Sequence, residues 1–317
     1  MNRRGTRAAI LLIASFSAIA QSPPAQVKTA KITVLSTMLA DRGFGEWGFA
    51  ALVEADGHTI LFDTGAAPDT VLRNARLLGI DLSTVEELIL SHNHTDHTGG
   101  LLTLRSDVMK KNSKALSRAY VAKGIFYPRA ANGALALRDP FLKGGGAFTE
   151  IDAPRELYPG VWLTGPVPRK YPERNFTMNG KAGDVTLPDG SSVEDNVPED
   201  QSMVLNTAQG LVVLSGCGHS GIVNTLTYAR TAIRDVPIHA ALGGFHLFQA
   251  DDKTLAWTGE KLREMKVANF LGAHCTGIEA VYKLREAAGL TRRTCSVGAV
   301  GATFTLGNGL SPGRISQ

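Results

Sequence analysis

The chain has 317 residues, of which 44% are hydrophobic and 20% are charged, so it can bury a large core. Its formal charge is +4, but Arg3, Arg4 and Arg7 supply three of these charges, and 4 − 3 leaves about +1 for the remainder. This balance does not favour nucleic acid as a partner, and we expect a small-molecule substrate instead.

The first twenty residues have the parts of a secretory signal peptide. A basic start, MNRRGTR, precedes the apolar stretch AAILLIASFSAIA, which is too short to span a bilayer and ends in a small-residue cleavage motif. We therefore expect cleavage near Ala20, export to the periplasm or the medium, and a mature single domain at 21–317. No later segment predicts stable membrane insertion.

The first half of the mature chain predicts alternating strands and helices. Residues 49–63, FAALVEADGHTILFD, predict a β-hairpin with its turn at Asp56 and Gly57. Apolar residues at helical spacing follow over 69–85, then a short buried strand over 85–91 and a helix over 99–112. The intervening loop, at the carboxyl end of a strand, is where chemistry is expected.

The stretch from about 120 to 200 is rich in Gly, Pro and Arg, and it predicts an irregular insert or lid with one or two hairpins. Regular alternation returns with a hairpin over 201–216, followed by helices and strands in turn. Three of these later strands end in a glycine and a histidine, in the segments SGCGHSG, LGGFHLF and LGAHCTG.

The segment LILSHNHTDHTGGL places His92, His94, Asp96 and His97 within six positions after an apolar strand. Imidazole and carboxylate are ligands of zinc, iron and manganese, and burying four such groups without a metal would be costly. Residues at i and i+2 of an extended loop point the same way, so His92 and His94 can hold one ion. Asp96 and His97, where the loop enters a helix, can reach a second. His58 and His239 are expected to be structural.

The motif H-x-H-x-D-H after a strand, preceded by FDTG, resembles the metallo-β-lactamase fold superfamily. The segments SGCGHSGI, GGFHL and HCTG are together similar to one branch, the dihydropterin (ribofuranosyl)aminobenzene phosphate synthase-like group of metal-dependent hydrolases. The resemblance implies an α/β fold, a four-layer αββα sandwich, with the metal site at one edge.

The resemblance also implies a ligand set for two ions, with zinc expected and iron or manganese as alternatives. The chain lacks the usual third histidine of the first site, since Glu199 and Asp200 stand there, and it lacks the usual bridging aspartate. His219 is predicted to replace the missing ligand, with Asp200 as a ligand or a supporting residue. The predicted metal ligands are His92, His94, Asp96, His97, His219 and His274.

Other side chains are assigned supporting roles. Asp63 is expected to anchor the histidine loop from beneath, and His246 to be a proton donor or a further ligand. Arg169 is predicted to bind an anionic substrate group. Cys217 and Cys275 suit either ligation or packing, and packing is favoured. Aromatic residues proposed for a substrate wall are Trp47, Tyr171, Phe176 and Trp162, of which Trp162 better suits the core.

Three functions remain open. The first is an exported binuclear metal hydrolase of a small ester, lactone, amide or phosphoester, in which a metal-bound hydroxide attacks, Asp96 orients it and His246 protonates the leaving group. The second is the synthase or transferase activity of the named branch, which export disfavours. The third is a non-catalytic metal-dependent binding protein, which the intact motif disfavours.

Overall fold

The computed structural model describes residues 24–130, 133–175 and 183–316. The predicted signal peptide therefore lies outside the described residues. Within them, no helix has both the length and the apolar character needed to cross a membrane.

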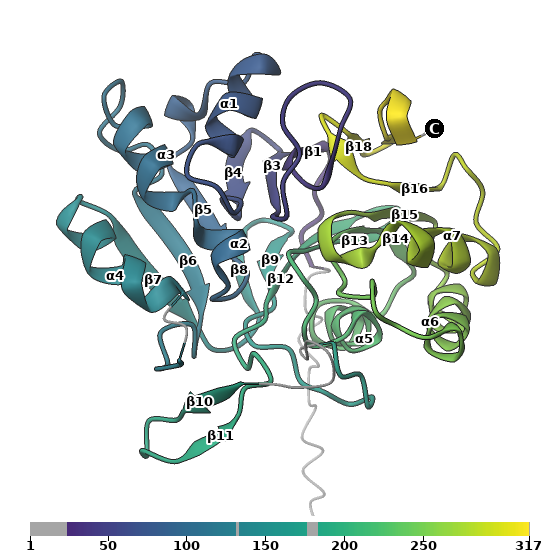
Figure 1. The fold of residues 1–317 in the computed structure, drawn as a ribbon. Coiled ribbons are helices and arrows are strands. Elements are labelled where there is room, and N and C mark those ends of the chain that lie inside the picture. Colours follow the sequence, from purple (N-terminus) through teal and green to yellow (C-terminus); the bar gives the residue numbers. More distant parts are fainter. Residues whose placement is uncertain (1–23, 131–132, 176–182, 317) are drawn as a thin grey trace, which may run out of the picture.

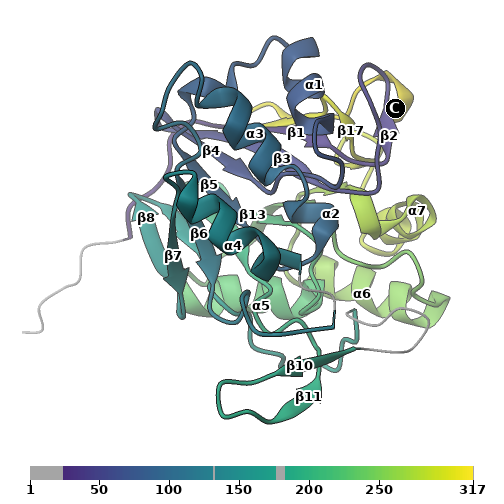
Figure 2. The same cartoon turned by 60° about the vertical axis from the view of Figure 1, so that its left-hand side comes forward.

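Two large β-sheets pack face to face and carry helices on their outer faces, as Figures 1 and 2 show. The first sheet has the strand order β19-β18-β1-β3-β4-β5-β6-β7. Its strands are β1 (Ala30–Ser36), β3 (Ala50–Ala55), β4 (His58–Phe62), β5 (Glu87–Leu90), β6 (Arg118–Ala122), β7 (Ala147–Ile151), β18 (Thr303–Thr305) and β19 (Gly309–Ser311).

The second sheet has the strand order β16-β15-β14-β13-β12-β9-β8. Its strands are β8 (Arg155–Tyr158), β9 (Val161–Leu163), β12 (Ser202–Thr207), β13 (Gly210–Ser215), β14 (Ile238–Gly243), β15 (Asn269–Gly272) and β16 (Cys295–Val297). Two small pairs complete the strands: β2 (Leu39–Ala40) with β17 (Ala299–Val300), and β10 (Asp184–Thr186) with β11 (Ser192–Glu194).

The helices divide between the two outer faces. The first sheet carries α1 (Thr70–Leu77), η1 (Leu82–Thr84), α3 (Leu101–Val108) and α4 (Gly133–Lys143). The second carries α5 (Ile222–Ala232), α6 (Asp252–Glu264) and α7 (Ile278–Ala287). The short helices α2 (Thr95–Thr98), η2 (His274–Thr276) and η3 (Arg314–Ser316) lie in connections.

Alternating side chains along the strands explain the layers. In β3, Ala51 and Val53 join the core between the sheets, whereas Ala50 and Leu52 pack under the first helical layer. In β13, Val212 faces the inter-sheet core and Val213 faces the second helical layer. Because both faces of each sheet are covered, the central strands bury apolar residues on both faces, as LVVL at 211–214 of β13 shows. The predicted four-layer αββα sandwich is confirmed.

The predicted hairpins are also confirmed. Strands β3 and β4 pair around Asp56 and Gly57, both of which have positive φ, as a tight hairpin turn requires. Strands β12 and β13 pair over the predicted 201–216 hairpin.

The predicted insert at 120–200 is largely part of the sandwich. Strands β6 and β7 extend the first sheet, and β8 and β9 extend the second. Of the strands described in this stretch, only those of the β10–β11 hairpin stand apart, and Figure 1 shows the hairpin projecting below the sandwich. The sequence concealed β8 and β9 because they have only four and three residues, and it concealed α4 because Pro140 lies inside that helix.

Candidate metal centre

The histidine loop begins where β5 ends at Leu90 and reaches α2 at Thr95. His92 is fully buried, and its Nε2 lies 3.1 Å from Nδ1 of His94. His97, on α2, is also buried, and its ring centre lies 4.2 Å from that of His92. The loop therefore gathers its imidazoles at one edge of the sandwich.

Asp63 lies beneath this loop, at the end of β4, in the left-handed backbone region with φ 58°. Its Oδ1 accepts a hydrogen bond from the Ser91 backbone N–H at 2.7 Å, and its Oδ2 accepts the Ser91 hydroxyl at 2.7 Å. The same Oδ2 lies 2.8 Å from Nδ1 of His97. A proton on that Nδ1 leaves Nε2 of His97 with its lone pair available for a metal.

The second sheet contributes the facing groups from the ends of its parallel strands. His219 follows β13, and its ring centre lies 4.7 Å from that of His92. His274 follows β15, and its Nε2 lies 3.2 Å from Nε2 of His97 and 3.3 Å from Asp96 Oδ2. The structure thus brings together all six ligands predicted from the sequence.

These side chains form groups in which the candidate ligand atoms lie within 4.8 Å of one another. The groups are His92–His94–Asp96, His92–Cys217–His219, His97–Cys217–His274 and Cys217–His246–Cys275. Among the described residues, His219 Nε2, His246 Nε2 and His274 Nδ1 are buried without a hydrogen-bond partner. Buried, unpartnered imidazole nitrogens that face other imidazoles fit a metal centre, because a cation would satisfy the lone pairs.

Burial sets the protonation of the first-site histidines. It lowers the pKa of His94 to about 4 and, with the neighbouring imidazoles, holds the pKa values of His92 and His219 well below their usual range. All three are therefore neutral at pH 7, the form that binds metals. Burial also opposes charge on His274, but Cys275 and Asp96 outweigh it and raise its pKa to about 10.

Cys217 occupies a more central place than packing alone requires. Its Sγ lies 2.9 Å from Sγ of Cys275 and 3.2 Å from Nδ1 of His246, and it belongs to three of the four ligand groups. Sequence analysis favoured packing for both cysteines. The signal for Cys217 was its position two residues before His219.

Asp200 and Arg169 have mainly structural contacts. Asp200 Oδ2 accepts the Ser220 backbone N–H at 2.7 Å, and among the described residues Asp200 belongs to none of the ligand groups. Arg169 donates to the backbone carbonyls of Asn196, Val197 and His219. Both therefore support the His219 loop, and substrate binding by Arg169 stays a prediction.

A second buried carboxylate supports the histidine loop and has no assigned role in the sequence analysis beyond its position. Glu199 Oε1 accepts the Asn93 backbone N–H at 3.2 Å, and its Oε2 pairs with Arg129 at 2.6 Å. Arg129 also pairs with Asp195 at 2.6 Å. This ion-pair network holds the backbone between His92 and His94.

A cavity of about 740 Å³, large enough for a small organic substrate, reaches the candidate metal centre at His246. His246 lines it, so this residue contacts both Cys217 and the cavity. The other lining residues include Glu173, Arg174, Asn175, Lys253 and Trp257. The cavity therefore mixes apolar, cationic and anionic groups.

Of the aromatic residues proposed for a substrate wall, Trp47 lies at the metal centre. Its side chain is 45% exposed, and its ring centre lies 5.1 Å from that of His274. Tyr171 packs against Trp257, and Trp162 packs against the core of the second sheet. Phe176 lies outside the described residues.

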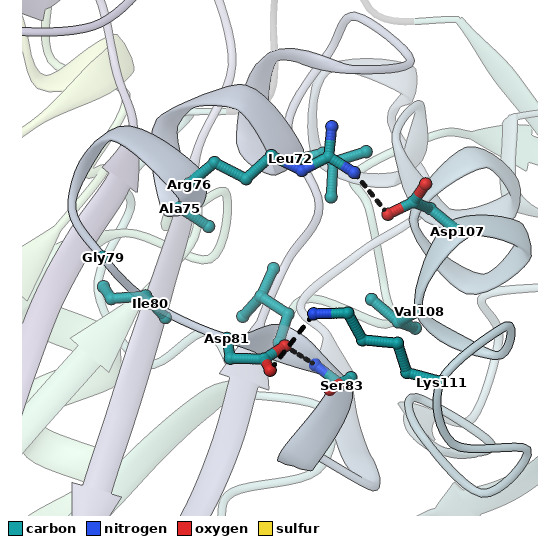
Figure 3. A pocket seen from close by; sticks show the side chains of 11 residues that line it. Leu72, Ala75, Arg76, Gly79, Ile80, Asp81, Ser83, Asp107, Val108 and Lys111 are labelled. Carbon is teal, nitrogen blue, oxygen red and sulfur yellow. Dashed lines mark hydrogen bonds and ion pairs between the residues drawn. The ribbon is translucent and has the colours of Figure 1, made fainter.

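A smaller hollow of about 240 Å³ lies between α1, η1 and α3 (Figure 3). Its rim carries two ion pairs, Arg76–Asp107 at 2.7 Å and Lys111–Asp81 at 3.4 Å. None of the candidate ligands lines it, so it has no part in the metal centre.

The region around the histidine motif matches a family model, and most of the chain aligns with a characterised relative. Residues 48–124 match the family described as the metallo-beta-lactamase superfamily. The chain is 30% identical over 246 residues to the 7,8-dihydropterin-6-methyl-4-(beta-D-ribofuranosyl)-aminobenzene-5′-phosphate synthase of Methanocaldococcus jannaschii, covering 75% of this chain and 83% of that protein. The chain belongs to the metallo-β-lactamase superfamily.

Solved structures agree with this assignment. The crystal structure of Tm1679, described as a metal-dependent hydrolase of the beta-lactamase superfamily, is similar with a TM-score of 0.66 and 27% identity, over 86% of this chain and 98% of that one. Zinc-bound PqqB from Methylobacterium extorquens shares the fold, with a TM-score of 0.52 and 16% identity over 86% of this chain and 99% of that one. Membership of the metallo-β-lactamase superfamily implies metal binding, which the ligand groups match.

Proposed function

We propose that this chain is an exported metal-dependent hydrolase that binds two divalent ions, with zinc as the expected metal, and cleaves a small ester, lactone, amide or phosphoester. Two ligand groups carry the proposal, His92–Cys217–His219 and His97–Cys217–His274, together with the 740 Å³ cavity that His246 lines. Two such ions would lower the pKa of a shared water and polarise a carbonyl or phosphoryl oxygen of the substrate.

The chain's own residues would then divide the work. Asp96, 22% exposed at the side chain, has an Oδ2 that could accept a hydrogen bond from an attacking water and so orient the oxygen of that water toward the substrate. His246 reaches the cavity and has a buried Nε2 without a partner, so it can deliver a proton to the leaving group there. The fixed Asp63–His97 pair keeps His97 in one tautomer throughout.

The experiment is metal content per chain by elemental analysis, on protein purified without chelator, followed by a hydrolase substrate screen. We expect about two ions per chain in the wild type and about one in His97→Ala. His58→Ala is the matched control, because His58 stacks on Tyr158 and belongs to none of the ligand groups. A wild-type chain that binds no zinc, iron or manganese would remove the proposal.

A pterin-related synthase or transferase is the second candidate, because the methanogen synthase is 30% identical over most of its length. The location of the mature chain separates the two. Cleavage near Ala20 and recovery outside the cytoplasm favour the hydrolase, since phosphoribosyl and pterin intermediates belong to the cytoplasm. An uncleaved cytoplasmic chain that condenses a pterin with an aminobenzene ribosyl phosphate would favour the synthase.

A further inference from the structure

We propose that the Cys217 thiolate is a ligand common to both metal positions, in place of the bridging aspartate expected for the superfamily. This inference rests on the proposed binuclear centre. The groups His92–Cys217–His219 and His97–Cys217–His274 share no histidine, and Cys217 is their common member. Its Sγ therefore lies within 4.8 Å of ligand nitrogens on both sides.

The local backbone delivers this sulfur to the centre. Cys217 follows β13 directly after Gly216, and it is 2% exposed. A Cβ on Gly216 would lie 2.1 Å from Ser91 Oγ and 2.5 Å from Asp63 Oδ2. A glycine at 216 thus permits the end of β13 to approach the anchored histidine loop, which comes from the other sheet.

The surroundings of the sulfur differ from those of a packing cysteine. Its nearest polar partners are the Cys275 sulfur at 2.9 Å and the His246 ring at 3.2 Å, and its neighbours in the groups are imidazoles. Cys295, by contrast, lies in the apolar cluster under the second helical layer, with a carbonyl oxygen of Val281 at 3.7 Å. Cys295 shows what a packing cysteine of this chain looks like.

Charge balance supports the same assignment. Two divalent ions bring four positive charges into a largely buried site, and neutral imidazoles compensate none of them. Asp96 is the only carboxylate in the ligand groups of the described residues, so a thiolate from Cys217 adds a second anionic ligand. Burial raises the pKa of the free Cys217 thiol, but a coordinating cation removes its proton.

Cobalt(II) substitution tests the proposal, because sulfur ligation gives an intense near-ultraviolet charge-transfer band that nitrogen and oxygen ligands do not give. We expect the band to grow with both the first and the second equivalent of cobalt. Growth with one equivalent only would show that Cys217 serves a single position, and would overturn the shared role. X-ray absorption on the zinc form should show sulfur at about 2.3 Å.

Matched variants assign the sulfur. Cys275→Ser should keep the band and Cys217→Ser should lose it, although the two sulfurs are adjacent. Cys217→Asp should bind two ions without the band. The reverse pattern would overturn the assignment. A wild type that binds two ions through nitrogen and oxygen alone refutes this inference and leaves the proposed hydrolase intact, whereas a wild type without ions refutes both. Even if a variant fails to fold, the wild-type spectrum decides whether sulfur serves both metal positions.

Discussion

At the scale of single residues, Asp63 shows how one buried carboxylate organises the centre. It has a left-handed backbone conformation that a residue other than glycine adopts only at some cost, and its two oxygens serve three donors. The carboxylate thus fixes Ser91 and His97 together. Loss of its charge should therefore lower the affinity for the ion that His97 is proposed to bind.

Replacement of Asp63 by Asn tests this role. The amide must place its NH₂ either against the Ser91 backbone N–H or against both the Ser91 hydroxyl and the His97 ring, so at least one acceptor is lost. We expect the affinity for one of the two ions to fall roughly 10- to 100-fold, measured by competition with a chromophoric chelator. Asp189→Asn, in the exposed turn between β10 and β11, should leave both affinities unchanged. Unaltered affinities in Asp63→Asn would show that the carboxylate only supports the fold.

The depressed pKa values predict how the metal-free protein responds to acid. His94 has a pKa of about 4 when folded, and the pKa values of His92 and His219 are also lowered, whereas an unfolded histidine has a pKa near 6.5. Between these values the unfolded chain binds more protons at these three positions, so the three histidines lower the free energy of unfolding as pH drops from about 6.5 to 4. Burial raises the pKa of Glu173 and of Glu199 to about 7, and these two carboxyl groups act in the opposite direction over much of the same range. His274 does not contribute to this change, because its pKa is raised.

Chemical denaturation of the metal-free chain at several pH values measures this slope. His94→Gln should gain stability relative to the wild type as pH drops over the same range, because the variant lacks one histidine that must stay neutral in the folded chain. His58→Gln, at a partly exposed site away from the centre, is the control and should keep the wild-type slope. A stability difference between His94→Gln and the wild type that stays constant from pH 6.5 to 4 would contradict the lowered pKa of His94.

The histidines of the centre could be predicted because their spacing has no other economical explanation. The role of Cys217 could not, because a cysteine beside a histidine suits both packing and ligation. The choice depends on Gly216 and the opposite sheet, which no local pattern reveals. The ion pair between Arg129 and Glu199 could not be predicted for the same reason, because 70 residues separate its two members.

At the scale of elements, the loops at strand ends hold the site, and glycines in these loops permit positive φ and close packing. Gly221 precedes α5 with φ 95°, directly after the His219 loop. A Cβ there would lie 2.3 Å from the Glu173 carboxyl group, which accepts the Asn224 backbone N–H at 2.9 Å. Glu173 also lines the cavity, so this glycine joins the helix start to the cavity wall.

Gly221→Ala and Gly289→Ala form a matched pair. Both positions have positive φ, but a Cβ on Gly289 meets nothing within 4 Å. We expect Gly289→Ala to lower the free energy of unfolding by roughly 1–2 kcal/mol through backbone strain alone. Gly221→Ala should cost roughly 2–4 kcal/mol, since the clash with Glu173 adds to that strain. Equal losses in urea denaturation would show that Glu173 moves aside freely.

The sequence predicted these elements well where strands and helices alternate with clear periods, as in β12 to α7. Over 120–200 it predicted one or two hairpins, which β8–β9 and β10–β11 match, but not that most of this stretch joins the two large sheets. Here β8, β9 and β10 are each three or four residues long. Such strands gain their stability from pairing with distant partners. Their own composition therefore does not reveal them.

At the scale of the whole molecule, the candidate ligands come from both sheets. His92, His94 and His97 belong to the first sheet's connections, whereas His219 and His274 follow strands of the second. Bound ions would therefore join the two halves of the sandwich. At a free ion concentration a thousand times the dissociation constant, one site should stabilise the folded chain by about 4 kcal/mol.

Thermal unfolding with and without zinc measures how much the bound ions stabilise the folded chain. We expect Tm to rise on loading and to fall back on addition of a chelator. His97→Ala should gain less than the wild type. His239→Ala should gain as much as the wild type, because His239 belongs to none of the ligand groups and its ring packs on Phe304. An unchanged Tm in a protein shown to hold two ions would mean that the ions do not prefer the folded state.

The adjacent sulfurs of Cys217 and Cys275 make the metal-free protein sensitive to oxidation. Two thiols this close can lose two protons and two electrons to dissolved oxygen and become a disulfide. The bond would consume the proposed shared ligand, so an ion would protect the pair. After denaturation, a loaded chain should show three free thiols and an aerated apo chain 3 − 2 = 1, with reductant restoring the capacity for metal. In an exported chain, the rate of metal binding relative to the rate of thiol oxidation would then decide how much protein becomes active.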